Sequence, residues 1–292
     1  MKVYESLFKQ HINQSLGDVF AHFYPINGDY AAPFRNIGSL TSEGLNSWEF
    51  NQPRFLQKYP VGNVAKLKNY LNYTFVRLVE LEQGAAGQYF KVSADGEWIC
   101  FNTGLQDPHG SDLLAVFQKY QPRPNAPARV VPDWVFKGCF SPNKQLYRDH
   151  FGTSVPDIAW YSKDSRDFIF DLNYELESEV FEHLFDRAKE RAGLPNADDE
   201  VVRNYLKGAL ANLKPKIRRN YKVAIPVYYV EEKRMQLLLP FASASVAGEY
   251  SCFLVERDDT HQLYRLKTIF DLDQAYFSAR LLTRPDKDWL NP

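Results

Sequence analysis

A dipeptide, Asp95-Gly96, separates two runs of β-prone residues, QYFKVSA and EWICFNT. Asp-Gly between such runs is the strongest short-range signal of a β-hairpin, because tight hairpin loops need positive φ angles that these residues accept. The C-terminal third of the chain has the same organisation in residues 222–242 and again in residues 250–270. A chain with these paired runs is predicted to build mainly antiparallel sheet.

Helical patterns lie between the hairpins. Residues 63–84 place apolar side chains at a 3.6-residue period and end in glycine, which predicts a helix. The same period predicts helices in residues 174–193 and 198–213, and Asp271 with Gln274 forms a capping-box pattern for a final helix. The predicted fold class is therefore α+β, with a mainly antiparallel sheet and several packed helices.

The length of 292 residues is sufficient for one large domain or two modest ones. We expect a lead-in over residues 1–44, which contains glycine, proline and many aromatic residues, followed by a single domain over residues 45–292. A weaker candidate boundary lies within residues 121–130. The proline-rich middle of the chain is expected to consist of loops around short strands at residues 133–140, 157–162 and 167–172.

Charge and cysteine content limit the function classes. The net charge of −1 gives no global attraction to nucleic acids or membranes, so such binding would need a local patch. Cys100, Cys139 and Cys252 are far apart and have no metal-ligand spacing, so we expect no disulfide framework, no metal and no cofactor. The sequence shows no signal-peptide pattern and no membrane-spanning run, which predicts a cytoplasmic protein without a membrane partner.

Several separated motifs occur in the order and spacing of a known family. They are FNTGL at residues 101–105, DWVFKGCF, YKVAIPVYY, RMQLLLPF and the ending TIFDLDQAYFSARLL. Over residues 45–292 the chain is similar to the bacterial family called domain of unknown function 3825. The resemblance implies an RNA context, because that domain is associated with cold-shock-type and OST-HTH (LOTUS-type) RNA-binding modules. It implies RNA or a nucleotide, and other RNA-binding proteins, as partners, and it transfers no catalytic residue.

The strongest local charge pattern is a basic helix. Residues 201–222 contain seven cations and no carboxylate. At about 100° of rotation per residue, four of the cations fall within about 60° of one another, beside the apolar face. Such a row suits successive phosphates, because each contact adds a salt-dependent attraction. The candidate phosphate-binding residues are Arg203, Lys207, Lys214, Arg218, Arg219 and Lys222.

A second interpretation of this helix needs no ligand. Acidic residues at the start of a helix and cations at its end are favoured by the helix dipole alone. Pro215 is also expected to kink or end the helix and so to interrupt the row. This interpretation accounts for residues 214–222, but Arg203 and Lys207 lie too early in the helix to be explained by the dipole. Both interpretations remain open.

The turn-rich segment at residues 101–112 is the second candidate region. Asn102 and Thr103, beside a glycine at an expected strand end, would present polar groups to a pocket, together with Arg280 of the final helix. His109, which follows Asp107 by two residues, would be a general base, and these two residues are the only catalytic candidates. The alternative is that all of these residues serve turns, surface packing or core hydrogen bonds.

The leading hypothesis is an RNA-associated protein that binds single-stranded RNA, or another phosphate-containing ligand, through the basic helix and nearby aromatic residues. One alternative is a nuclease-like phosphoesterase that acts on nucleic acids or nucleotides. Another is a protein–protein interaction module that uses its many tyrosines and phenylalanines. No complete catalytic motif is present, so the sequence does not decide whether the protein is an enzyme.

Overall fold

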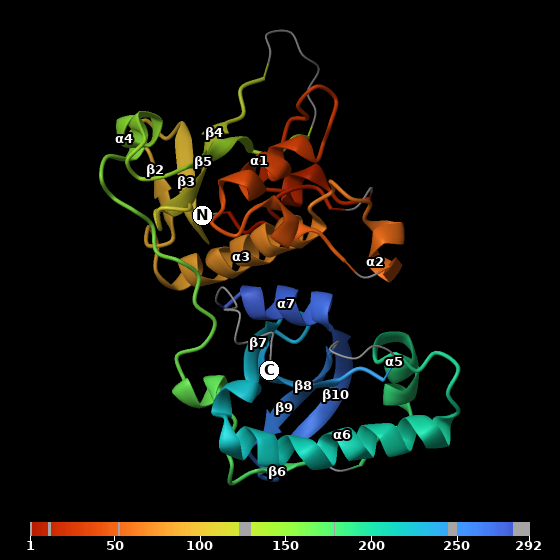
Figure 1. The fold of residues 1–292 in the computed structure, drawn as a ribbon. Coiled ribbons are helices and arrows are strands. Elements are labelled where there is room, and N and C mark those ends of the chain that lie inside the picture. Colours follow the sequence, from red (N-terminus) through yellow and green to blue (C-terminus); the bar gives the residue numbers. More distant parts are fainter. Residues whose placement is uncertain are drawn as a thin grey trace. The chain divides into compact units, whose positions relative to one another are not determined.

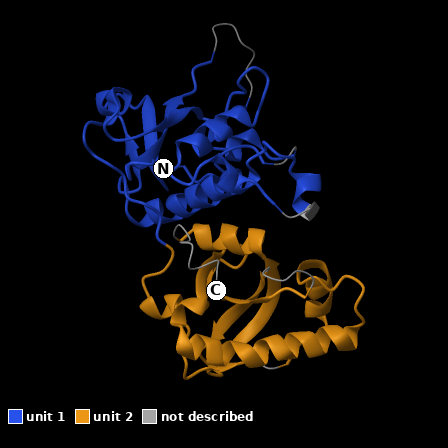
Figure 2. Cartoon of the chain, in the orientation of Figure 1, with its two compact units in different colours: residues 1–160 blue, residues 161–292 orange. Residues whose placement is uncertain are grey.

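A computed structural model describes residues 2–10, 13–51, 53–122, 130–177, 179–244 and 250–282. The chain divides into two compact units, residues 1–160 (unit 1) and 161–292 (unit 2), which Figure 2 distinguishes by colour. Each unit has its own sheet and its own helices (Figure 1). Among the helices of the described residues, none is long and apolar enough to cross a membrane.

The sheet of unit 1 has the strand order β1-β5-β4-β3-β2. Strands β2 to β5 are antiparallel to their neighbours, and the short β1 pairs in parallel with β5. The elements in chain order are η1 (Leu16–Asp18), β1 (Ala21–His22), α1 (Ala32–Leu40), η2 (Leu45–Trp48), α2 (Pro53–Lys58), α3 (Ala65–Gly84), β2 (Phe90–Val92), β3 (Trp98–Gln106), β4 (Asp112–Lys119), β5 (Trp134–Phe140) and α4 (Gln145–Phe151).

Both faces of this sheet are covered, because successive side chains of a strand point to opposite faces. On one face, Phe101 and Phe117 of the sheet join Phe75 of α3 and Phe20, which precedes β1, in a cluster of rings whose neighbouring centroids lie 4.8 to 5.7 Å apart. On the other face, Cys100, Leu114 and Val116 pack with the buried Tyr147 of α4. The aromatic content of the sequence is therefore used largely for packing.

The sheet of unit 2 has the strand order β6-β10-β9-β8-β7. All neighbouring strands are antiparallel except β6, which pairs in parallel with β10. The elements in chain order are η3 (Ser165–Phe168), β6 (Glu175–Leu176), α5 (His183–Arg191), α6 (Asp199–Arg219), η4 (Tyr221–Val223), β7 (Ile225–Tyr229), β8 (Arg234–Ala242), β9 (Tyr250–Asp258), β10 (Leu263–Asp271) and α7 (Leu272–Arg280).

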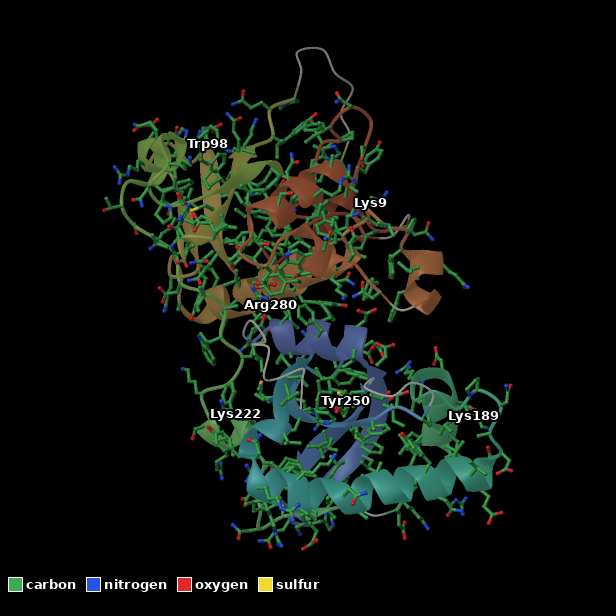
Figure 3. The ribbon with its side chains drawn as sticks, in the orientation of Figure 1. Lys9, Trp98, Lys189, Lys222, Tyr250 and Arg280 are labelled. Carbon is green, nitrogen blue, oxygen red and sulfur yellow. The ribbon has the colours of Figure 1, made fainter. Side chains whose placement is uncertain are left out.

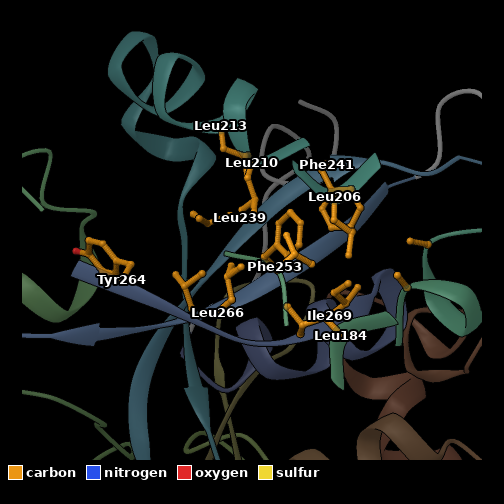
Figure 4. Close-up of a cluster of buried hydrophobic side chains, with 14 of the residues drawn as sticks. Leu184, Leu206, Leu210, Leu213, Leu239, Phe241, Phe253, Tyr264, Leu266 and Ile269 are labelled. Atoms are coloured by element: carbon orange, nitrogen blue, oxygen red, sulfur yellow. The ribbon is translucent and has the colours of Figure 1, made fainter. Parts of the chain in front are cut away.

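Helices also cover both faces of the unit 2 sheet. On one face, Leu206, Leu210 and Leu213 of α6 belong to one buried cluster with Leu239 and Phe253 of the sheet (Figure 4), and α5 completes this layer. On the opposite face, α7 packs against a second cluster that includes Leu238 and Leu254. The alternation of residues 237 to 239 between the two clusters places α6 and α7 on opposite sides of the sheet.

The predicted class, α+β with mainly antiparallel sheets and several packed helices, is confirmed. The Asp95-Gly96 hairpin forms between β2 and β3, and the two C-terminal hairpins form as β7–β8 and β9–β10. The helix predicted over residues 63–84 is α3, and the Asp271 carboxylate accepts the Gln274 amide at 2.9 Å as the cap of α7. Each of these elements carries a strong local signal.

The helix predicted over residues 174–193 is wrong in its first half, because α5 begins only at His183. Glu175–Leu176 forms the edge strand β6 instead. Next along the chain, the Glu177 carboxylate accepts the backbone amide of Leu266 at 2.8 Å. Pairing with the edge of the sheet thus determines the conformation of this segment, although its apolar residues have a helical period. It is a tertiary effect that local propensity cannot report.

Of the short strands expected in the middle of the chain, the one at 133–140 is present as β5, and those at 157–162 and 167–172 are wrong. Residues 157–162 are held instead by single contacts, such as the Arg77 guanidinium donating to the Trp160 carbonyl at 2.9 Å. Residues 165–168 form the 3-10 helix η3, which the Asp164 side chain caps by accepting the Arg166 amide. In these two segments, individual hydrogen bonds therefore take the place of the expected β-strand pairing.

The division into two units falls at residue 160 and not at residue 44, where the lead-in was expected to end. Leu7, Phe20 and Phe34 of the expected lead-in are buried within unit 1. The N-terminal residues therefore supply core side chains as well as β1 and α1. Most of the weaker boundary expected at 121–130 lies outside the described residues, which omit 123–129.

Candidate functional site

The basic helix of the sequence is α6. The Asp198 carboxylate caps it by accepting the Val201 amide at 2.9 Å, and acidic residues at 199 and 200 occupy its first turn. Apolar side chains at a helical period bury one face against the sheet: Val202, Leu206, Leu210, Leu213 and Ile217. This burial fixes the rotation of the helix, so the cations lie beside the buried stripe and outside the core.

Pro215 was expected to kink or end the helix, and it does not end it, because α6 continues to Arg219. The proline is exposed, so its missing amide leaves no unsatisfied partner inside the protein. Ile217 is buried beyond it and anchors the last turn. The row of Arg203, Lys207, Lys214 and Arg218 therefore lies on one continuous helix of about 1.5 Å rise per residue, a span of roughly 20 Å. We call these four residues the α6 surface.

Two cations of the α6 surface have partners within unit 2. The Lys214 ammonium lies 2.8 Å from the Glu175 carboxylate, and this hydrogen bond, followed by the charge of Lys214, lowers the pKa of Glu175. The Arg203 guanidinium lies 5.4 Å from the centroid of the Phe185 ring of α5, a cation–π contact. Lys207 and Arg218 are exposed and form no ion pair in the part of the chain that the structure describes.

Arg219 and Lys222, the other predicted phosphate-binding residues, are also exposed but lie off this row. Arg219 is rotated by about 100° from Arg218 at the end of the helix. Lys222 follows the helix in η4, where its backbone amide donates to the Asn220 side chain at 3.1 Å (Figure 3). The structure therefore brings together four of the six predicted residues.

The predicted pocket residues Asn102 and Thr103 are buried in unit 1 and support β3 and β4. The Asn102 amide nitrogen donates to the Asp112 carboxylate at 3.0 Å, and the Asn102 oxygen accepts the Gly104 amide at 3.0 Å. The Thr103 hydroxyl donates to the Leu113 carbonyl at 2.6 Å. These side chains hold an irregularity of the β3–β4 ladder, where the register shifts after Asn102.

Gly104 fixes the shape of this irregularity. Its φ is +71°, and a β-carbon at this position would lie 2.8 Å from the Tyr70 hydroxyl. That hydroxyl donates to the Thr103 carbonyl at 2.9 Å. The Asn-Thr-Gly sequence is therefore explained by backbone geometry inside β3.

The catalytic candidates Asp107 and His109 lie in the turn between β3 and β4. The Asp107 carboxylate accepts the backbone amides of His109 and Ser111, each at 2.9 Å. The carboxylate thus bonds the backbone of His109 and not its ring, which is exposed. In this arrangement, the Asp107 side chain stabilises the turn between the two strands.

Arg280, the third pocket candidate, belongs to unit 2 and is buried at the C-terminal end of α7 (Figure 3). Because α7 and α6 lie on opposite faces of the sheet, Arg280 does not join the α6 surface. Within the described residues, no group of three or more His, Cys, Asp or Glu side chains is placed to hold a metal ion.

Unit 1 contains a cavity of about 590 Å³ that the sequence does not predict. Its walls include Phe8, His22, Phe23, Phe34 and Lys68. These residues come from the N-terminal segment, β1, α1 and α3, and no local pattern links them. The one available signal was the concentration of aromatic residues in the first part of the chain.

The fold and the α6 surface define an α+β protein with a cationic helical face. A family model described as Domain of unknown function (DUF3825) matches residues 42–289, and the chain belongs to this family. The predicted membership is thereby confirmed, with a match that begins three residues earlier than expected. No curated protein and no solved structure matches the chain.

Proposed function

We propose that the protein binds single-stranded RNA through phosphate contacts to the α6 surface. The observation that carries this proposal is the exposure of Lys207 and Arg218 on one side of α6, without an ion-pair partner in the described part of the chain. Phosphate oxygens would supply the missing counter-charge, and each contact would release condensed cations from the nucleic acid. The choice of RNA among polyanions rests on the family resemblance.

The helix dipole explains only part of this charge pattern. It favours Arg218 in the last turn, where the carbonyl end of the helix is negative. It does not favour Lys207, which lies in the middle of the helix, and Arg203 has a packing partner in Phe185. Lys207 is therefore the residue of the α6 surface whose position neither the helix dipole nor side-chain packing explains.

The phosphoesterase alternative gains no support from the two catalytic candidates. The Asp107 carboxylate is occupied by backbone amides of its own turn. Neither Asp107 nor His109 lies on α6 or within unit 2, the unit that carries the cationic row. RNA binding at the α6 surface without phosphoester hydrolysis is therefore the simpler proposal.

The test is fluorescence anisotropy of a short labelled oligouridine with the full chain, at low and at physiological salt. Replacing both Lys207 and Arg218 by Ala should weaken binding and reduce the slope of log affinity against log salt by about 0.7 per lost contact. Lys216→Ala is the matched control, because Lys216 is an exposed cation of the same helix that is rotated by about 180° from Lys207. An unchanged slope in the double variant would overturn the proposal.

A further inference from the structure

The cavity in unit 1 has the size of a small-molecule site. Its volume of about 590 Å³ falls within the range of roughly 300 to 1,000 Å³ that is typical of ligand pockets. Its walls come from residues 8–10, the segment around β1, the aromatic side of α1 and the first turns of α3. All the lining residues belong to unit 1 and to the described part of the chain.

Three phenylalanine rings form an apolar wall of this cavity. Phe23 and Phe34 stack with a centroid distance of 4.8 Å and an angle of 13°, and Phe8 meets Phe34 edge-on at 4.9 Å. Phe136 of β5 stacks behind Phe23 at 4.4 Å and supports it from the sheet. Phe34 and Phe136 cover the two faces of Phe23, so this wall offers a planar ligand apolar and edge contacts, and Phe8 is the most exposed of its rings.

The charged groups of the lining are all basic. Lys9 and Lys68 line the cavity, and no Asp or Glu is among its lining residues. His22 also lines it, and burial lowers the pKa of this imidazole, which favours its neutral form. The side chains that line the cavity therefore carry a net positive charge, which favours an anionic ligand.

Lys68 is the half-buried cation of the site. Its ammonium donates to the Asn63 side-chain oxygen and lies 5.2 Å from the centroid of the Phe34 ring. Within the described residues it forms no ion pair. Burial is the main cause that lowers the pKa of Lys68, with smaller opposing contributions from the charges of Asp29 and Glu49.

The carboxylates nearest to Lys68 are already engaged. Asp29 forms an ion pair with Arg35 and also accepts the Ala31 amide at 2.8 Å. Glu49 accepts the backbone amides of Gly62 and Val64, at 3.1 and 3.3 Å, before the start of α3. The protein thus places a desolvated ammonium beside an aromatic wall without giving it a carboxylate of its own.

The lining also offers side chains that can orient a polar ligand. Asn69 follows Lys68 in α3, and neither it nor His22 makes a side-chain hydrogen bond to any of the described residues. Tyr30 and Tyr59 line the cavity with their phenol groups. A few polar groups around an apolar wall are the usual composition of a specific small-molecule site.

We propose that the unit 1 cavity binds a nucleoside monophosphate, with the base against Phe8, Phe23 and Phe34 and the phosphate at Lys68. The planar base matches the apolar wall, the phosphate supplies the direct ion pair that Lys68 does not form with any described residue, and Asn69 and His22 can bond the sugar or the base edge. This site is separate from the α6 surface, which belongs to unit 2. Its ligand is a small molecule held in a cavity.

The experiment is isothermal titration calorimetry of the full chain with AMP, GMP, CMP and UMP, alongside adenosine, inorganic phosphate and benzoate. At least one nucleotide should bind. It should bind at least about tenfold more tightly than adenosine or phosphate, because only the nucleotide contacts both the phenylalanine rings and the Lys68 ammonium. Absence of binding for all four nucleotides overturns the proposal. Equal binding of adenosine overturns the role of Lys68, and benzoate binding as tightly as the best nucleotide overturns the assignment of the ligand class.

The variants separate the cavity from other cationic sites. Lys68→Met keeps the length of the side chain but removes the charge, and it should lower nucleotide affinity at least about tenfold. Lys68→Arg should retain most of the affinity, and Lys144→Met, at an exposed lysine outside the cavity, should not change it. Asn69→Leu should weaken binding without loss of the thermal transition. Normal affinity in Lys68→Met, or a loss of affinity in Lys207→Ala, would contradict this assignment.

Discussion

The Lys214 ammonium lies 2.8 Å from the Glu175 carboxylate, so the middle of the α6 surface is bonded to the edge strand β6. The Lys214 side chain is 23 % exposed, whereas that of Glu175 is 78 % exposed. An RNA phosphate that contacts Lys214 must therefore compete with a carboxylate of the protein itself. If the proposed function holds, Glu175 competes with the RNA phosphate for Lys214.

The first prediction concerns this competition. Glu175→Gln should release Lys214 and increase the affinity for oligouridine severalfold, with a salt slope steeper by about 0.7, because one more cation is available for phosphate. Anisotropy titrations at several salt concentrations measure both quantities. Glu179→Gln is the control at an exposed glutamate, and it should leave the slope unchanged. A weaker or unchanged affinity in Glu175→Gln would show that Lys214 does not contact RNA.

The second prediction concerns Asn102 and Thr103. Because both side chains are buried and hydrogen-bonded within β3 and β4, Asn102→Leu and Thr103→Val should each lower the free energy of unfolding by about 1 to 3 kcal/mol. Denaturant titration of the full chain measures this loss. Gln106→Ala, at an exposed position of β3, should stay within about 0.5 kcal/mol of the wild type.

The same two variants separate a structural role from a ligand-binding role. RNA and nucleotide affinities should be unchanged in Asn102→Leu and Thr103→Val at temperatures where each variant is folded. A variant with normal stability but reduced affinity for RNA or nucleotide would show that the substituted residue contributes to ligand binding.

The third prediction concerns the free cysteines. Burial raises the pKa of Cys100, Cys139 and Cys252 to about 12 each, so their thiolate forms are scarce at pH 8. Because the thiolate is the nucleophile, the native protein should react with a thiol reagent such as DTNB at least about 100-fold more slowly than free cysteine. All three thiols should react quickly in denaturant. Fast reaction of one thiol in the native state would show that its surroundings open.

The fourth prediction concerns the pH dependence caused by Lys68. Burial lowers the folded-state pKa of Lys68 below its usual value of 10.5, so the unfolded chain binds more protons in the interval between the two values. The cost of the buried charge is fully present below the folded-state pKa and disappears as pH rises toward 10.5. The wild type should therefore gain stability relative to Lys68→Met over this interval.

Thermal unfolding of both proteins at a series of alkaline pH values measures this difference, and Lys144→Met serves as the reference at an exposed lysine. A bound nucleotide should reduce the gain, because its phosphate favours the charged ammonium. A constant difference between wild type and Lys68→Met at every pH would contradict the burial of this charge.

Elements with a strong local signal could be predicted from the sequence. The Asp95-Gly96 turn, the apolar period of α3 and the Asp271 cap each depend on interactions within a few residues, and each forms as expected. The cations of α6 were also placed correctly relative to its buried face, since the helical period alone determines that geometry.

The errors have a different origin. Residues 175–177 are not helical, because they form hydrogen bonds with β10, a strand distant in the sequence. Asn102 was interpreted as a ligand-binding residue because its partner Asp112 becomes recognisable only when β3 and β4 pair. In both cases a hydrogen bond outside the local segment determined the outcome.

The sequence by itself therefore determined the hairpins, the long helices, the fold class and the family, because these follow from local propensity, from the period of apolar residues and from ordered motifs. The tertiary structure alone decided which polar residues are structural and where a cavity lies. Phe8, Phe34 and Lys68 become neighbours only when the N-terminal segment, α1 and α3 pack together. The burial that leaves Lys68 without a carboxylate is a property of that packing, and no local pattern in the chain encodes it.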